Sequence, residues 1–202
     1  MKHFQLGILG VTGSGKSYLT QEIIKHINAS RSIVIDDLMQ ITPDNYQRVH
    51  SLDEFIFQLL EKDQFKIIVS LEDDSEYYDI FAIIWHLNNL VLTIDELSLF
   101  CDPYSIPESL RNITQRGRLK NISLIWNTQR PANISRNIST QTEFVVSFKL
   151  YEFADLSYFQ LNKNKIEKII NLDKNNYEYV IARGDETDIT KRLNNYKFFS
   201  QK

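Results

Sequence analysis

The sequence has very little cysteine, since Cys101 is the single one among 202 residues. One thiol cannot form an internal disulfide, and the histidines show no spacing of the kind that binds structural zinc. The N-terminal region lacks the features of a signal peptide, and no run approaches the roughly 18 apolar residues of a membrane helix. We therefore expect an intracellular protein that has no transmembrane segment of its own.

An excess of basic charge is also missing, because the formal net charge is -3 and the isoelectric point is about 5.8. A protein that holds nucleic acid through bulk charge is basic, so the composition gives no general attraction to DNA. A local cluster of basic residues can still supply one. The hydrophobic share of 43% is that of a globular protein rather than a disordered chain.

Short apolar runs alternate with helical patterns along the first three quarters of the chain. We expect strands at 4–9, 32–35, 65–71, 90–94, 123–127, 142–148 and 177–182, and helices at 17–27, 52–61, 76–87 and 107–116. In the first helix, Tyr18, Leu19, Ile23, Ile24 and Ile27 recur at helical spacing. Strands that are apolar throughout indicate a mostly parallel sheet with helices on both faces, an α/β fold.

The last fifty or so residues are more polar and less regular, and a turn is expected at 183–185. A length of 202 residues suits one domain with a sizeable core and is too short for two large ones. We expect a single domain over 1–202, in which 1–150 is the core and 151–202 is a small C-terminal extension.

The strongest motif follows the first strand and opens the first helix. It consists of Gly10, Val11, Thr12, Gly13, Ser14, Gly15, Lys16 and Ser17, a phosphate-binding loop or Walker A motif. Glycines let successive backbone amides converge on phosphate oxygens, and the start of the helix adds about half a positive charge. Lys16 reaches the β- and γ-phosphates, and the Ser17 hydroxyl can bind Mg²⁺. The motif predicts binding of ATP with Mg²⁺.

Two acids, Asp95 and Glu96, end the apolar strand at 90–94 in the manner of a Walker B motif. The carboxyl ends of strands are where α/β sheets place their ligands. We expect Asp95 to support Mg²⁺ and Glu96 to polarise the attacking water, which makes the protein a hydrolase. Small-molecule kinases do not need a water-activating glutamate.

The strand at 123–127 runs into the tetrapeptide Thr128-Gln129-Arg130-Pro131, and the segment before it contains Arg116-Gly117-Arg118. With the loop and the acid pair in this order, residues 4–148 resemble the FtsK/HerA superfamily of P-loop ATPases. The genome-packaging ATPases of membrane-containing double-stranded DNA viruses are the most similar members, because the chain shows no additional DNA-recognition domain. The resemblance implies a RecA-like (ASCE) fold with about five to seven strands.

The resemblance also implies roles for individual residues. Gln129 matches the sensor that contacts the γ-phosphate or the water and reports hydrolysis to the DNA-gripping loops. Arg116 and Arg118 are candidates for an arginine finger that reaches a neighbouring subunit's nucleotide. Weaker candidates are Arg111, Arg130 and Arg136.

Aromatic residues are abundant, with 12 phenylalanines and 10 tyrosines. Aromatic rings can stack on bases, but Phe55, Phe57, Phe144 and Phe148 lie in expected helices and strands and are predicted to be core. Tyr77 and Tyr78 lie in the acidic segment 72–79, where a solvated helix start is a simpler interpretation than a pore loop.

The sequence favours an ATPase motor that moves double-stranded DNA into a preformed capsid. Such a motor implies a pentameric or hexameric ring, contacts with capsid or packaging-vertex proteins, and a place in the host cytoplasm or at the packaging vertex. Two alternatives stay open. One is a small-molecule or nucleotide kinase, in which Asp36 and Asp37 contact the acceptor. The other is a nucleotide-dependent phage assembly or secretion factor that moves no DNA.

Overall fold

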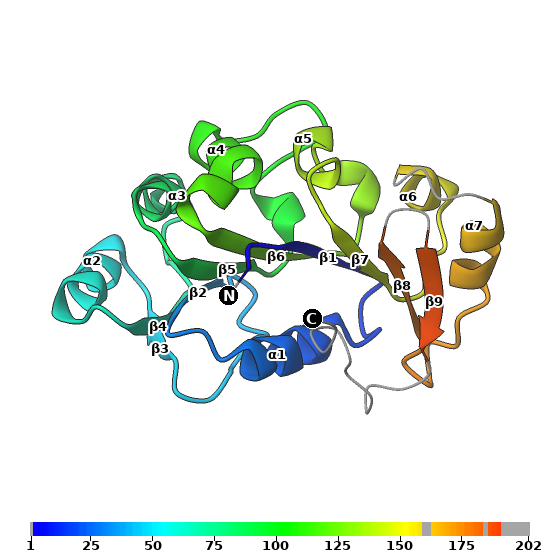
Figure 1. The fold of residues 1–202 in the computed structure, drawn as a ribbon, viewed down its shortest axis with the longest axis horizontal. Helices are drawn as coiled ribbons and strands as arrows, with labels where there is room; N and C mark the ends of the chain where they lie inside the picture. The colour runs from blue at the N-terminus through cyan, green and yellow to red at the C-terminus, as the bar shows by residue number, and fades with distance from the viewer. Residues whose placement is uncertain (1, 159–162, 184–185, 191–202) are drawn as a thin grey trace.

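The computed structural model describes residues 2–158, 163–183 and 186–190 and contains one nine-stranded sheet (Figure 1). The strands are β1 (Gln5–Leu9), β2 (Arg31–Ile35), β3 (Gln47–Val49), β4 (Phe65–Val69), β5 (Leu90–Ile94), β6 (Ile122–Thr128), β7 (Phe144–Ser147), β8 (Tyr179–Arg183) and β9 (Glu186–Thr190). The α-helices are α1 (Lys16–Ile27), α2 (Leu52–Glu61), α3 (Glu76–His86), α4 (Glu108–Arg116), α5 (Arg136–Ser139), α6 (Phe153–Tyr158) and α7 (Lys163–Ile170). Short 3-10 turns are η1 (Leu97–Leu99), η2 (Gly117–Lys120) and η3 (Pro131–Asn133).

The strand order is β3-β4-β2-β5-β6-β1-β7-β8-β9, and every pairing from β3 to β7 is parallel. The predicted mostly parallel sheet is therefore confirmed, with more strands than expected. Residues of β1, β5 and β6 are all buried, which is why their sequences are apolar rather than alternating. The register sets Leu9 beside Thr128 and Ile94 beside Trp126, so β1, β6 and β5 end at the same edge.

Helices cover both faces of the sheet, as predicted (Figure 1). Helix α1 lies on one face, where Leu19 and Ile23 pack into a cluster with β1. Helices α3, α4 and α5 lie on the other face, where Ile84 of α3 and Leu110 of α4 join the larger cluster. A parallel sheet needs this double cover because both of its faces are apolar. None of the helices within the described ranges has the length and apolar character that crossing a bilayer requires.

Two predictions for aromatic residues are wrong. Phe57 was expected in the core, but its side chain is 57% exposed. Phe57 lies two residues from the buried Phe55, and positions two apart do not share a helix face. Tyr77 is buried in α3 rather than solvated, while Tyr78 is exposed. The Tyr77 hydroxyl accepts a hydrogen bond from the Leu71 backbone amide and donates one to Asp37, each at 3.0 Å.

The C-terminal part of the described chain extends the sheet. Strand β8 pairs antiparallel with β7, and β9 pairs antiparallel with β8. Strand β8 begins at Tyr179, so Tyr177, which was expected in a strand, lies in a turn with a positive φ of 51°. The expected turn at 183–185 falls largely outside the described residues, and the sequence pattern did not predict β3 or β9.

Candidate functional site

The loop between β1 and α1 has the backbone that its glycines predict. Gly13 and Gly15 have φ angles of 72° and 103°, in the left-handed region that side chains disfavour. A Cβ on Gly10 would lie 2.6 Å from Ser14 Oγ and 2.7 Å from Phe148 Cβ, which leaves no room for one. The loop is therefore a tight backbone turn that ends at the first residue of α1, where amide groups and the helix dipole favour an anion.

Lys16 is buried at the start of α1, and its ammonium folds back over the loop. Its Nζ donates to the carbonyl oxygens of Gly10 and Val11 at 2.8 and 3.3 Å. Burial lowers the pKa of Lys16, and the negative charges of Glu96 and Asp95 partly oppose this shift. The ammonium thus lies against the loop carbonyls, within electrostatic reach of the acid pair.

The Asp95 carboxylate is almost fully buried behind the loop. Asn127 Nδ2 donates to Asp95 Oδ1 at 2.5 Å, and Asn127 Oδ1 accepts from the Thr20 hydroxyl of α1 at 3.0 Å. This chain of side chains ties the end of β5 to α1 through β6. Burial raises the pKa of Asp95 to about 6; the Asn127 hydrogen bond opposes this shift and nearby Asp36 adds to it.

Glu96 has a left-handed backbone, with φ 54° and ψ 70°, which is uncommon for a non-glycine residue. Its carboxylate accepts the hydroxyls of Ser98 and Thr128 at 2.5 and 2.8 Å and the Gln129 amide at 3.1 Å. Because a carboxylate offers about four acceptor positions, at least one stays free for a water. Strain of this kind is often found at functional sites, where the surrounding structure holds it in place.

Gln129 contacts both the phosphate loop and the acid pair. Its side-chain Oε1 accepts the Thr12 hydroxyl at 2.5 Å. Since its own backbone amide donates to Glu96, one residue contacts both the loop and the acid. The structure thus brings together Lys16, Asp95, Glu96 and Gln129, which the sequence predicted from separate segments.

The candidate arginines are not part of this constellation. Arg116 and Arg118 are exposed at the end of α4 and in η2, just before β6 begins, at the amino edge of the sheet. The loop lies at the opposite, carboxyl edge, so neither arginine serves the loop of its own chain. Among the weaker candidates, Arg130 forms ion pairs with Glu152 and Asp155 at 2.7 and 3.0 Å. Arg111 and Arg136 are exposed.

Sequence patterns missed several residues at this site. Asn127 was predicted only as part of an apolar strand. An amide side chain inside such a strand is the one signal that could have marked it as a site residue. The side-chain oxygen of Gln40 accepts a hydrogen bond from the Ser17 hydroxyl at 3.2 Å. The Gln40 backbone amide donates to the buried carboxylate of Asp36 at 2.8 Å. Tyr177 reaches the loop from 160 positions away in the chain, and no local pattern could have shown that contact.

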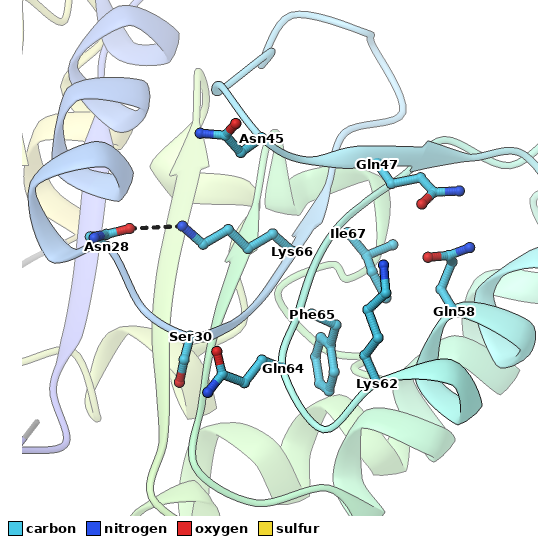
Figure 2. A pocket seen from close by; sticks show the side chains of 10 residues that line it. All are labelled: Asn28, Ser30, Asn45, Gln47, Gln58, Lys62, Gln64, Phe65, Lys66 and Ile67. Carbon is cyan, nitrogen blue, oxygen red and sulfur yellow. Dashed lines mark hydrogen bonds between the residues drawn. The ribbon is translucent and has the colours of Figure 1, made fainter.

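A cavity of about 560 Å³ opens over the loop. It is lined by Thr12, Gly13, Gly15, Lys16, Ser17, Tyr18, Gln40, Gln129 and Tyr177. A second hollow of about 470 Å³ lies at the amino edge of β2 and β4, away from the glycine loop (Figure 2). Its walls are mainly amide and lysine side chains such as Gln58, Lys62 and Lys66, and Lys66 is held by Asn28 at 2.7 Å. The loop cavity is the chemical site because its lining combines an anion-binding backbone with Lys16 and with Gln129, whose amide donates to the buried Glu96.

The residues of the loop cavity fit a nucleotide with Mg²⁺. Gly10 and Gly15 form a cradle that a Cβ would fill, and the Ser17 hydroxyl and Asp95 carboxylate are the hard oxygen donors that Mg²⁺ prefers. Within the described ranges, no group of three or more His, Cys, Asp and Glu side chains could hold a metal alone. In nucleotide sites Mg²⁺ is typically bound through one or two protein oxygens together with phosphates.

No family model matches the sequence, and no curated protein sequence matches it either. Solved structures do match. The genome-packaging NTPase B204 of Sulfolobus turreted icosahedral virus 2, in complex with sulfate, has a TM-score of 0.78 and 18% identity over 97% of this chain and 100% of that one. In its complex with ATP-gammaS, B204 gives a TM-score of 0.75 at 18% identity, with 95% and 98% of the two chains covered.

Two proteins of other kinds have the same fold. VirB4 of Thermoanaerobacter pseudethanolicus has a TM-score of 0.66 and 13% identity over 93% of this chain and 88% of that one. The pCW3 conjugation coupling protein TcpA has a TM-score of 0.65 and 14% identity over 94% and 60%. The chain therefore shares the RecA-like P-loop NTPase fold of B204, VirB4 and TcpA.

Proposed function

We propose that this protein is an ATP-hydrolysing motor that moves double-stranded DNA into a preformed viral capsid. The observation that carries the proposal is the position of β6 between β1 and β5, which gathers the loop, Glu96 and Gln129 at one edge of the sheet. The likeness to a genome-packaging NTPase over the whole of both chains supports the choice of motor.

The site residues divide the work of hydrolysis. The loop amides and Lys16 hold the β- and γ-phosphates, and Ser17 and Asp95 hold Mg²⁺, which when bound neutralises charge on the phosphate oxygens. Glu96 orients the attacking water and takes its proton at the free carboxylate position. Gln129, which contacts both Thr12 and Glu96, passes the change at the γ-phosphate to the end of β6.

The exposed position of Arg116 and Arg118 supports action between subunits. A nucleotide held at the carboxyl edge of one subunit can meet the amino-edge arginines of the next in a pentameric or hexameric ring. An arginine supplied in this way is typically worth about 10³- to 10⁵-fold in rate. The ring would operate in the host cytoplasm, in contact with capsid or packaging-vertex proteins.

The experiment is a steady-state ATPase assay of purified protein with and without double-stranded DNA, alongside a measurement of oligomer mass. We expect hydrolysis that DNA stimulates in a ring-sized oligomer and that Lys16→Ala abolishes. Lys62→Ala, in the amino-edge hollow of Figure 2, is the matched control and should keep wild-type turnover. Unchanged hydrolysis in Lys16→Ala would refute the site, and turnover indifferent to DNA would refute the motor.

The same assay separates the alternatives. Slow hydrolysis that ignores DNA would favour an assembly or secretion factor, and stimulation by a small acceptor would favour a kinase. The structure weighs against the kinase at Asp36, whose carboxylate is fully buried. This carboxylate accepts hydrogen bonds from the backbone amides of Gln40 and Ile41 and forms an ion pair with Arg48, at 2.8 to 3.0 Å. It is therefore not available to the phosphate-accepting substrate of a kinase.

A further inference from the structure

We infer that Tyr18 and Tyr177 bind the base of the nucleotide, so that the C-terminal part of the chain selects what the phosphate loop holds. This assignment rests on the proposed function, because it takes the loop to be a nucleotide site. Both tyrosines line the loop cavity, and both are large side chains left about half exposed, at 55% and 47%.

The two rings approach the loop from opposite ends of the chain. Tyr18 follows Ser17 directly on the first turn of α1. Tyr177 comes from the turn between α7 and β8, and its Cδ1 lies 3.1 Å from the point where a Cβ of Gly15 would be. A side chain at position 15 would press on the ring, so glycine favours this close approach to the backbone that binds phosphate.

The turn that carries Tyr177 is built by its own hydrogen bonds. The Asp173 carboxylate accepts the Asn175 amide at 2.9 Å, and the Asp173 amide donates to Glu178 Oε2 at 2.9 Å. The Tyr177 amide donates to the carbonyl of Lys174 at 3.2 Å, and Tyr177 holds a left-handed φ of 51°. A non-glycine residue in this region is uncommon, so the surrounding turn holds the backbone from which the ring projects.

The same turn brings a cation to the loop. Lys174 Nζ lies 3.8 Å from the point where a Cβ of Gly13 would be, and its charge contributes to the lowered pKa of Lys16. A lysine beside a phosphate-binding backbone adds positive charge where an anionic ligand would be held.

The direction of the nucleotide follows from the sheet. Glu96 and Gln129 come from β5 and β6, on one side of β1, so the γ-phosphate lies toward that side. Strands β7 and β8 lie on the other side of β1, and the turn before β8 carries Tyr177. The far end of the nucleotide therefore extends toward Tyr18 and Tyr177. Flat aromatic faces bind a base by stacking, and a base lost from such a stack weakens binding by about ten-fold or more.

The test compares two ligands by calorimetry in the presence of Mg²⁺: ATP, and inorganic tripolyphosphate, which lacks the base. Tyr177→Ala and Tyr18→Ala should each bind ATP about ten-fold more weakly and bind tripolyphosphate as the wild type does. Tyr177→Phe, which keeps the ring, should retain ATP affinity. Tyr104→Ala is the matched control, since Tyr104 is 99% exposed and lies outside the cavity.

Three outcomes would overturn the inference. One is unchanged ATP binding in both alanine variants, another is an equal loss of ATP and tripolyphosphate binding, and the third is wild-type protein that binds the two ligands equally. Failure of the proposed function looks different, because then wild type binds neither ligand, or Lys16→Ala binds both normally. Thermal unfolding of each variant checks that the fold is intact.

Discussion

Replacing Asp95 with asparagine is expected to stabilise the protein while removing its response to Mg²⁺. Asp95 is 3% exposed, and burial raises its pKa from 3.8 to about 6. A carboxyl group with a raised folded-state pKa costs stability once it ionises. The cost is absent below about pH 4, where both states are protonated, and complete above about pH 6, where both are ionised.

The magnitude follows from the size of the shift. One pKa unit corresponds to about 1.36 kcal/mol, so ionised Asp95 lowers the free energy of unfolding by roughly 3 kcal/mol at neutral pH. Asparagine keeps an oxygen that can accept the hydrogen bond from Asn127. Its new amide group also needs an acceptor, so we expect a net gain of about 1 to 3 kcal/mol.

The assay is urea unfolding of wild type and Asp95→Asn at pH 5, 6 and 8 without nucleotide or metal. The stability difference between the two proteins should grow as pH rises from 5 to 8. With ATP present throughout, adding Mg²⁺ should then raise the unfolding midpoint of wild type and leave that of the variant nearly unchanged. A difference that does not depend on pH, or a variant less stable at every pH, would refute this account of the acid.

Three other changes test separate parts of the structure. Glu96→Gln should keep ATP affinity and slow hydrolysis by about 10²- to 10⁴-fold, measured as turnover against binding, and unchanged turnover would remove Glu96 from the mechanism. Gly7→Ala should cost about 1 to 3 kcal/mol of stability in urea unfolding, because its Cβ would lie 2.5 Å from the Trp126 ring; a neutral effect would mean that the ring can shift. Arg48→Met should cost about 3 to 5 kcal/mol by leaving the buried Asp36 unpaired, and full stability in that variant would contradict the ion pair.

Local sequence patterns were sufficient to predict the individual parts of this site. The glycine spacing of 10–17 predicted the loop, since glycine adopts the positive φ angles observed at positions 13 and 15 without the steric cost that a side chain brings. Apolar runs of strand length determined β1, β5 and β6, and the acids that follow β5 marked where the chain leaves the sheet. Helix α2 matches its predicted bounds because Ser51 accepts the Glu54 amide as an N-cap.

Tertiary structure alone decided how these parts meet. Strand order is set by pairing between distant segments, so nothing local placed β6 between β1 and β5 or gave Asn127 its two partners at the loop. The burial that raises the pKa of Asp95 is likewise a property of the packed sheet. The turn at Tyr177 lies against Gly15 only because β8 pairs with β7 beside β1, a contact between the two ends of the chain that no local residue pattern encodes.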